Sequence, residues 1–259
     1  MLYVAYGVIY GFAFLFGICI GSFLNVVIYR VPNHISVAKG RSFCPKCGES
    51  LKAIDLVPVV SFLCLKRRCR YCGEPISGRY PLVELLGGIF FVISVAVYGI
   101  TWQSLITFMA ACILIAIAFI DRDTMEIPNG LVLLLMIPAL LTAIPILAIN
   151  DATIISKLIG VVAVALPMIL MNLIISNSFG GGDIKLMAVC GFMLGWQSEL
   201  VAIFIGLVTG GIYGIYLMTS GKKGRKDHFA FGPFLVVGIM VALYMGPALI
   251  GWYTSLFGL

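Results

Sequence analysis

The sequence predicts an all-α polytopic membrane protein with about eight transmembrane helices and one small polar insertion after the first helix. Of its 259 residues, 61% are hydrophobic and only 11% are charged, and the mean hydropathy is +1.11. Apolar runs of membrane-spanning length recur along nearly the whole chain. A single longer polar stretch, residues 30–80, interrupts them near the N-terminus.

The first predicted span covers residues 2–29. No charged residue precedes Arg30, so this run lacks the basic start of a cleavable signal peptide and is expected to stay as an anchor. One face of the span carries small and polar residues at helical spacing, namely Gly17, Gly21, Ser22 and Asn25. Such a face favours close helix packing. The alternative that Asn25 hydrogen-bonds a substrate or a catalytic group stays open.

Seven further spans are predicted, at residues 82–98, 105–120, 131–149, 154–175, 184–194, 200–218 and 229–252. The sixth of the eight is short for a membrane crossing, so a re-entrant segment is an alternative. The number of spans favours a full crossing. If the basic loops at residues 30–80 and 221–226 both lie in the cytoplasm, an even number of spans must separate them, and the count between them is six only when the sixth span crosses completely. The same count places Asp121 and Asp183 at the cytoplasmic ends of the third and sixth spans.

The positive charge is confined to a few places, although the net charge is +6. Ten of the 17 Lys and Arg residues lie in 30–79 and four more lie in 221–226. The positive-inside rule predicts that both segments are cytoplasmic. This distribution does not indicate a nucleic-acid partner, and membrane lipid with anionic headgroups is the expected partner of the basic segments.

The polar stretch contains two cysteine pairs with the spacing of zinc knuckles. Each pair is followed by glycine, and the four ligands would be Cys44, Cys47, Cys69 and Cys72. Such spacing predicts a structural zinc site, and about fifty residues need a metal because they cannot build a large core. Two disulfides are the alternative, which a reducing cytoplasm disfavours. The predicted domains are therefore a first helix (1–29), a cytoplasmic zinc-binding domain (30–80) and a transmembrane core (81–259).

Two acidic residues adjoin apolar runs. A charged group is costly in a membrane, so an acidic residue at such a position suggests a functional role. Asp183 directly follows the glycines 180–182, and Asp121 ends an apolar run about sixty residues upstream. Two carboxylates that share one proton divide into a base and an acid. Such a pair activates water and protonates a leaving amine, which is peptide hydrolysis without a covalent intermediate.

Other interpretations of these acidic residues remain. Asp183 alone has the place of a helix N-cap, and Asp123 and Glu126 fit a solvated loop. Asp121, Asp123, Glu126 and Asp183 together would suit a hard divalent cation, which describes a metal-dependent membrane enzyme. In a non-catalytic scaffold or transporter the same aspartates would form an ion path.

Five sequence blocks resemble the type IV prepilin peptidases. They are residues 21–30 (GSFLNVVIYR), the two cysteine knuckles, residues 77–84 (SGRYPLVE), Asp121 with Pro128 seven positions later, and residues 180–185 (GGGDIK). The resemblance implies a multi-pass aspartic endopeptidase of the Gly-x-Gly-Asp class in the bacterial inner membrane. It implies removal of the basic leader of type IV prepilins, or of the pseudopilins of type II secretion, at the cytoplasmic face.

The resemblance also implies roles for individual residues. Asp121 and Asp183 match the two catalytic aspartates, and Gly180, Gly182, Lys185 and Asp123 are expected to support them. One departure is Asn129, where many members carry Asp, and it is not expected to disable the site. Members with the zinc-binding piece usually also methylate the new pilin N-terminus with S-adenosylmethionine. The sequence contains no nucleotide-binding pattern that places this second activity.

Overall fold

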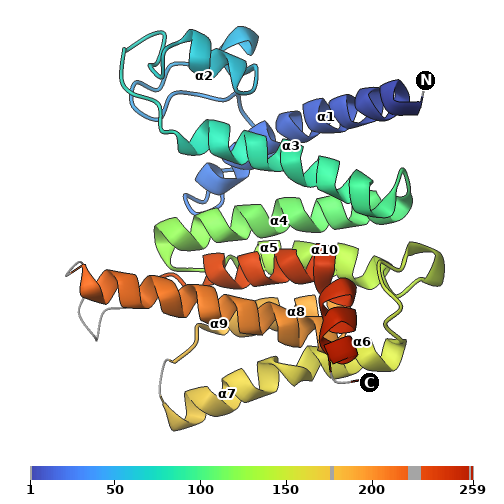
Figure 1. Ribbon diagram of the computed structural model, residues 1–259. Coiled ribbons are helices and arrows are strands. Elements are labelled where there is room, and N and C mark those ends of the chain that lie inside the picture. Colours follow the sequence, from blue (N-terminus) through green and yellow to red (C-terminus); the bar gives the residue numbers. More distant parts are fainter. Residues whose placement is uncertain (1, 176–177, 221–228, 257, 259) are drawn as a thin grey trace. The chain divides into compact units, whose positions relative to one another are not determined.

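The computed structural model describes residues 2–175, 178–220, 229–256 and 258, and helices are the only extended regular elements among them (Figure 1). The chain divides into two compact units, Met1–Phe108 and Met109–Leu259, which are described separately below. The predicted all-helical structure is therefore confirmed for the described residues. The basic segment 221–226 and its predicted cytoplasmic placement lie outside the described residues.

The first unit contains α1 (Leu2–Arg30), η1 (Ala53–Leu56), α2 (Val60–Cys64), α3 (Arg79–Tyr98) and the beginning of α4 (Trp102–Thr124). Helices α1 and α3 lie side by side (Figure 1). A β-carbon added at Gly17 would lie 2.5 Å from the carbonyl oxygen of Gly87, and one at Gly21 would lie 2.7 Å from Cα of Glu84. The small face predicted on the first span is therefore a close packing surface between backbones.

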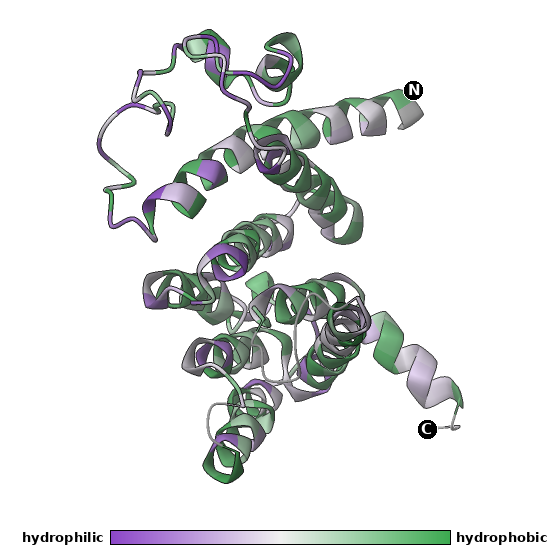
Figure 2. Cartoon of the chain, turned by 90° about the vertical axis from the view of Figure 1, so that its left-hand side faces the viewer, coloured by the Kyte–Doolittle hydropathy of each residue, from purple (hydrophilic) through white to green (hydrophobic). Residues whose placement is uncertain are grey.

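The segment between α1 and α3 folds as two similar tight turns, each built around one cysteine pair. In both turns the first cysteine accepts a backbone hydrogen bond from the glycine after the pair, at 2.9 Å from Gly48 and 3.0 Å from Gly73. These glycines have φ of 74° and 72°, a left-handed conformation that favours glycine. Hydrophilic residues concentrate in this segment, whereas the helices are mostly hydrophobic (Figure 2).

The second unit contains the rest of α4 together with α5 (Asn129–Leu141), η2 (Pro145–Leu147), α6 (Ile154–Ala163), α7 (Ala165–Ile174), α8 (Gly181–Leu194), α9 (Trp196–Thr219) and α10 (Gly232–Leu256). Helix α8 is central, because it contacts α5, α6, α7, α9 and α10. Its buried side chains include Leu186, Met187 and Cys190. The backbones of α6 and α8 meet closely where Gly160 faces Gly191.

Within the described part of the chain, six helical stretches are long and apolar enough to cross a membrane: α1, α3, α4, α6 with α7, α9 and α10. Helices α5 and α8 have 13 and 14 residues, or about 20 Å against a hydrocarbon core of about 30 Å. The predicted count of eight spans is therefore not confirmed. The predicted fourth span, 131–149, is α-helical only as far as Leu141.

The predicted fifth span, 154–175, is interrupted at Val164, which separates α6 from α7. Pro167 explains the interruption, because it has no N–H to donate to the carbonyl four residues earlier and its ring crowds that carbonyl. The chain nevertheless continues in one hydrophobic stretch from Ile154 to Ile174.

Candidate active site

Asp121 lies near the C-terminal end of α4, and its side chain is buried. Its Oδ2 accepts a hydrogen bond of 2.9 Å from the backbone N–H of Gly232, the first residue of α10. A β-carbon at position 232 would lie only 2.6 Å from the same oxygen. The carboxylate of Asp121 is thus held by a backbone group that only a glycine brings this close.

Asp183 is the third residue of α8 and is also buried. Its Oδ2 accepts a hydrogen bond of 3.2 Å from the backbone N–H of Gly180, which is the N-cap residue. The alternative that Asp183 is itself the N-cap is therefore wrong, because the N-cap is Gly180, three positions earlier. The carboxylate of Asp183 nevertheless accepts the backbone N–H of that N-cap residue. One oxygen of each aspartate is engaged in this way by a single backbone donor.

Two contacts bring the segment around Asp183 to the segment around Asp121, and the two carboxylates are near enough for the charge of one to act on the other. A β-carbon at Gly182 would lie 2.7 Å from Cβ of Ile127, so the two backbones approach without room for a side chain. Lys185 Nζ donates a hydrogen bond of 2.9 Å to Oδ1 of Asn129. The predicted meeting of the two motifs is therefore observed within the second unit.

This meeting constrains the path of the intervening helices. Asp121 ends α4, Asp183 begins α8 and Gly232 begins α10, and the three backbones converge. Between Asp121 and Asp183 the chain leaves the site along α5 and returns along the α6–α7 stretch. Between Asp183 and Gly232 it leaves along α8 and returns along α9. The short helices α5 and α8 thus each make one pass through the unit.

The loop that contains the glycines is organised by residues that sequence reasoning missed. Asn172, on α7, donates from Nδ2 to the carbonyl oxygen of Phe179 at 2.9 Å and accepts the N–H of Phe179 at 2.8 Å. The ring of Phe179 also lies 6.0 Å from that of Phe231, beside Gly232. A Gly-Pro pair at 232–233 is typical of a helix start, but no local signal relates it to Asp121.

The remaining acidic residues of the first motif are arranged differently. Asp123, in the last turn of α4, and Glu126, just after this helix, are exposed, whereas Asp121 is buried. Of all groups of His, Cys, Asp or Glu in the described part of the chain, only the four knuckle cysteines bring three or more potential ligand atoms together. The geometry therefore gives no support to a hard-cation site built from Asp121, Asp123 and Asp183.

The four knuckle cysteines form one cluster. The sulfur atoms of Cys44, Cys47, Cys69 and Cys72 lie within 4.8 Å of one another, and no described cysteine is in a disulfide. Tetrahedral zinc with bonds of about 2.3 Å places its sulfur ligands about 3.8 Å apart. The cluster therefore suits a zinc ion, which would join the two turns and replace the core that this segment lacks.

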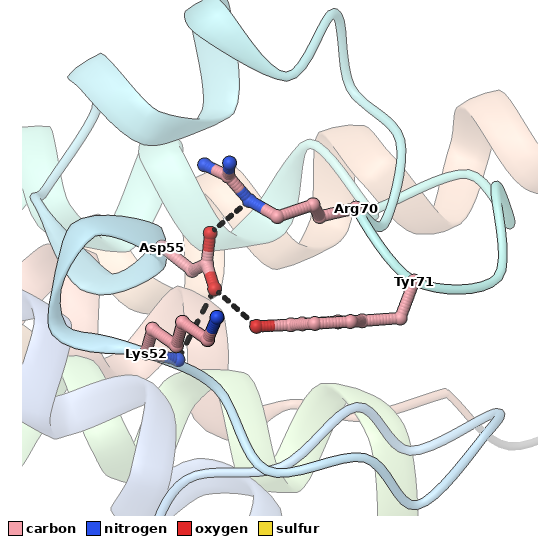
Figure 3. Close-up of polar contacts among 4 residues, drawn as sticks. All are labelled: Lys52, Asp55, Arg70 and Tyr71. Atoms are coloured by element: carbon pink, nitrogen blue, oxygen red, sulfur yellow. Dashed lines mark hydrogen bonds and ion pairs between the residues drawn. The ribbon is translucent and has the colours of Figure 1, made fainter.

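Asp55, in η1, anchors the second cysteine turn without metal (Figure 3). Its carboxylate accepts hydrogen bonds from the backbone N–H of Lys52 at 3.1 Å, from Nε of Arg70 at 2.7 Å and from the hydroxyl of Tyr71 at 3.0 Å. Desolvation acts to raise the pKa of Asp55, but these hydrogen bonds and the charge of Arg70 outweigh it and hold the pKa below its usual value. Asp55 is therefore an ionised anchor for the second cysteine turn.

Two known protein families match this chain, and the boundary between the two matches lies near the boundary between the two structural units. The family described as Bacterial Peptidase A24 N-terminal domain matches residues 15–98, and the Type IV leader peptidase family matches residues 108–215. No solved structure matches the chain.

Curated relatives align along almost the whole length. The prepilin leader peptidase/N-methyltransferase of Aeromonas salmonicida (strain A449) is 32% identical, over 95% of this chain and 94% of the relative. The proteins of the same name from Bacillus subtilis (strain 168) and Legionella pneumophila are 32% and 33% identical, over 94% and 92% of this chain and 97% and 92% of theirs. The membrane-embedded chain, with its paired aspartates and its cysteine cluster, is thus an enzyme that belongs to the type IV leader peptidase family.

Proposed function

We propose that the chain is a membrane aspartic endopeptidase in which Asp121 and Asp183 activate a water molecule. The observation that carries this proposal is the convergence of two buried carboxylates, each with one oxygen engaged by a backbone N–H. Both residues lie in the part of the chain that matches the peptidase family.

The reaction divides between the two carboxylates. The ionised one takes a proton from water while the water oxygen attacks the scissile carbonyl carbon. The protonated one then gives its proton to the departing amide nitrogen as the C–N bond breaks, so the pair again holds one shared proton. The N–H groups of Gly180 and Gly232 orient the carboxylates throughout.

The substrates that we infer are prepilins or pseudopilins, as the names of the relatives suggest. A prepilin has a short basic leader before an apolar helix, so the helix lies in the bilayer and the scissile bond lies at its surface. The active site and the cysteine segment would then both face the cytoplasm from the bacterial inner membrane. The basic residues of that segment would lie against anionic lipid headgroups rather than a basic leader.

The second activity that we propose is methylation of the new pilin N-terminus with S-adenosylmethionine. The relatives are named for an N-methyltransferase activity as well as for leader cleavage. Zinc bound by the four knuckle cysteines would be structural, because all four ligands are thiolates and leave no open position for a reactant.

The hydrolytic proposal is tested with a purified prepilin in liposomes, cleaved by the wild type and by Asp121→Asn and Asp183→Asn. Asn keeps the shape and removes the titrating group, so we expect each variant to lose about 10²–10⁴-fold in cleavage rate. Asp123→Asn is the matched control and is expected to cleave much faster than either, because its side chain is exposed.

Each protein is also assayed with a chelator of magnesium and manganese that leaves zinc bound. Activity that survives chelation in the wild type supports the aspartate pair. Loss of activity on chelation, with rescue by magnesium, would instead support a metal-dependent enzyme, and normal cleavage by Asp121→Asn or Asp183→Asn would refute the assignment of that residue.

A further inference from the structure

The first unit contains a cavity of about 670 Å³ that the hydrolytic proposal does not use. Its walls come from three parts of the unit, namely the C-terminal half of α1, the cysteine segment and the first turns of α3. A volume of this size is in the range of sites that bind small organic molecules. Both proposed catalytic aspartates lie in the other unit, so the cavity needs a different explanation.

Asn25, on α1, borders this cavity and carries a buried acceptor without a partner. Its side chain is 3% exposed, and Nδ2 donates a hydrogen bond of 3.0 Å to the carbonyl oxygen of Tyr80. That bond fixes which end of the amide is oxygen. Oδ1 has no partner among the described residues. A buried acceptor without a donor is costly, so Asn25 indicates a ligand that brings an N–H or O–H group.

Glu84, on α3, adds a carboxylate to the same wall. It is 7% exposed, and its Oε2 accepts a hydrogen bond of 2.7 Å from the backbone N–H of Val59. The hydroxyl of Ser22, which also lines the cavity, is a hydrogen-bond partner of this carboxylate. A nearly buried carboxylate and an unpaired amide oxygen, on two residues that border the same cavity, suit a ligand that carries positive charge and N–H donors.

Aromatic side chains complete the lining. Tyr29, Phe43, Phe62 and Tyr80 all border the cavity, and the rings of Tyr29 and Phe43 meet edge to face at 6.0 Å. Aromatic faces bind a flat heteroaromatic base by stacking and attract a cation. Asp55 and Arg70, whose ion pair anchors the second cysteine turn (Figure 3), lie in the same wall. The folded cysteine segment therefore forms a large part of the cavity wall.

We propose that this cavity binds S-adenosylmethionine and is the methyl-transfer site, with Asn25 and Glu84 as acceptors for its N–H groups. The ligand has a flat adenine, a sulfonium cation and an ammonium group, which match the rings, the carboxylate and the amide oxygen. The inference rests on the proposed methyltransferase function and gives it a place. It also gives a role to the domain at residues 15–98, which contains neither proposed catalytic aspartate.

The transfer at this site balances simply. The neutral α-amine of the new N-terminus attacks the sulfonium methyl carbon, the carbon–sulfur bond breaks, and sulfur keeps the electron pair as a neutral thioether. The product is an N-methylammonium, so no other reactant is consumed. An α-amine with a pKa of about 7.7 is partly neutral near pH 7, having released its proton to water.

Equilibrium binding of S-adenosylmethionine and S-adenosylhomocysteine to the zinc-loaded full chain in detergent tests the site. We expect Asn25→Leu and Glu84→Gln each to raise the Kd for S-adenosylmethionine by about tenfold or more. Asn33→Leu and Glu49→Gln change the same residue types at exposed positions outside the cavity, and are expected to bind like the wild type. Zinc content and melting temperature show whether each variant is folded.

Hydrogen exchange on the wild type gives a reading that does not depend on any variant. S-adenosylmethionine is expected to slow exchange in residues 21–30, 42–65 and 77–84. Protection confined to residues 109–220, or unchanged affinity in folded Asn25→Leu and Glu84→Gln, would overturn the site and leave methylation itself standing. Absence of both binding and methyl transfer in a wild type that cleaves prepilin would remove the methyltransferase proposal as well.

Discussion

The backbone N–H of Gly232 lies 2.9 Å from Oδ2 of Asp121, although 111 positions separate the two residues in the chain. The first residue of α10 thereby holds a carboxylate at the end of α4. Because an added β-carbon would lie 2.6 Å from that oxygen, the contact requires glycine. The beginning of α10 is therefore part of the candidate active site, even though the recognised motifs end well before it.

Gly232→Ala is expected to lower prepilin cleavage by about tenfold or more, because the methyl group displaces a carboxylate that must be positioned closely. The matched control is Gly251→Ala in the same helix, where nothing lies within 4 Å of the added carbon. Initial rates in liposomes provide the measurement. Equal rates for the two variants would show that the contact between Gly232 and Asp121 has no part in hydrolysis.

The three glycines before Asp183 are expected to differ in their tolerance of alanine. A β-carbon at Gly182 would lie 2.7 Å from Cβ of Ile127, whereas nothing lies within 4 Å of one at Gly181. Gly182→Ala should therefore separate the two motifs and lower cleavage strongly, and Gly181→Ala should retain near wild-type cleavage. Parallel assays of the two variants decide the matter, and similar losses in both would indicate that flexibility of the loop, rather than close approach, is what the sequence requires.

Lys185 and Asn129 form the polar contact between the two motifs, at 2.9 Å. Lys185→Met removes the donor and is expected to lower cleavage by several-fold, about 1 kcal/mol in transition-state stabilisation. Asn129→Asp keeps an acceptor for Lys185, so near wild-type cleavage is expected. A large loss in Asn129→Asp would mean that an added charge so near Asp121 and Asp183 disturbs them.

Sequence patterns predicted those features that depend on local chemistry. Hydropathy predicted the helices, and the cysteine spacing predicted a cluster whose sulfurs lie within 4.8 Å of one another. Counting membrane passes allowed Asp121 and Asp183 to meet, although the count of eight spans on which it relied is not confirmed. Helix lengths were less predictable, because an apolar run does not reveal where a helix ends. Residues 142–149 are apolar, yet α5 stops at Leu141.

Contacts made by the backbone over long separations could not be predicted from one sequence. The hydrogen bond from Gly232 to Asp121 and the support of Phe179 by Asn172 involve residues that carry no motif. Asn25 is an intermediate case. Its spacing indicated helix packing and left open a contact with a ligand. In the structure its Nδ2 donates to Tyr80, its Oδ1 is buried without a partner, and the residue borders the cavity.

Loss of zinc is expected to unfold the cysteine segment while α1 and α3 stay packed. The segment has few buried side chains besides Cys44 and Cys69, whereas α1 and α3 meet through glycine backbones that need no metal. Cys47→Ser should therefore abolish the binding of one zinc per chain. Cys64→Ser is the control, because Cys64 is an exposed cysteine in α2 outside the cluster.

Zinc content by mass spectrometry and hydrogen exchange over residues 31–78 provide the readings. Because this segment forms a large part of the wall of the cavity in the first unit, Cys47→Ser should also lose S-adenosylmethionine binding, and Cys64→Ser should keep it. Retained exchange protection in zinc-free Cys47→Ser would show that hydrogen bonds such as those of Asp55 suffice to fold the segment. The cysteine cluster would then be a metal site without a structural role, and the wall of the cavity would not depend on it.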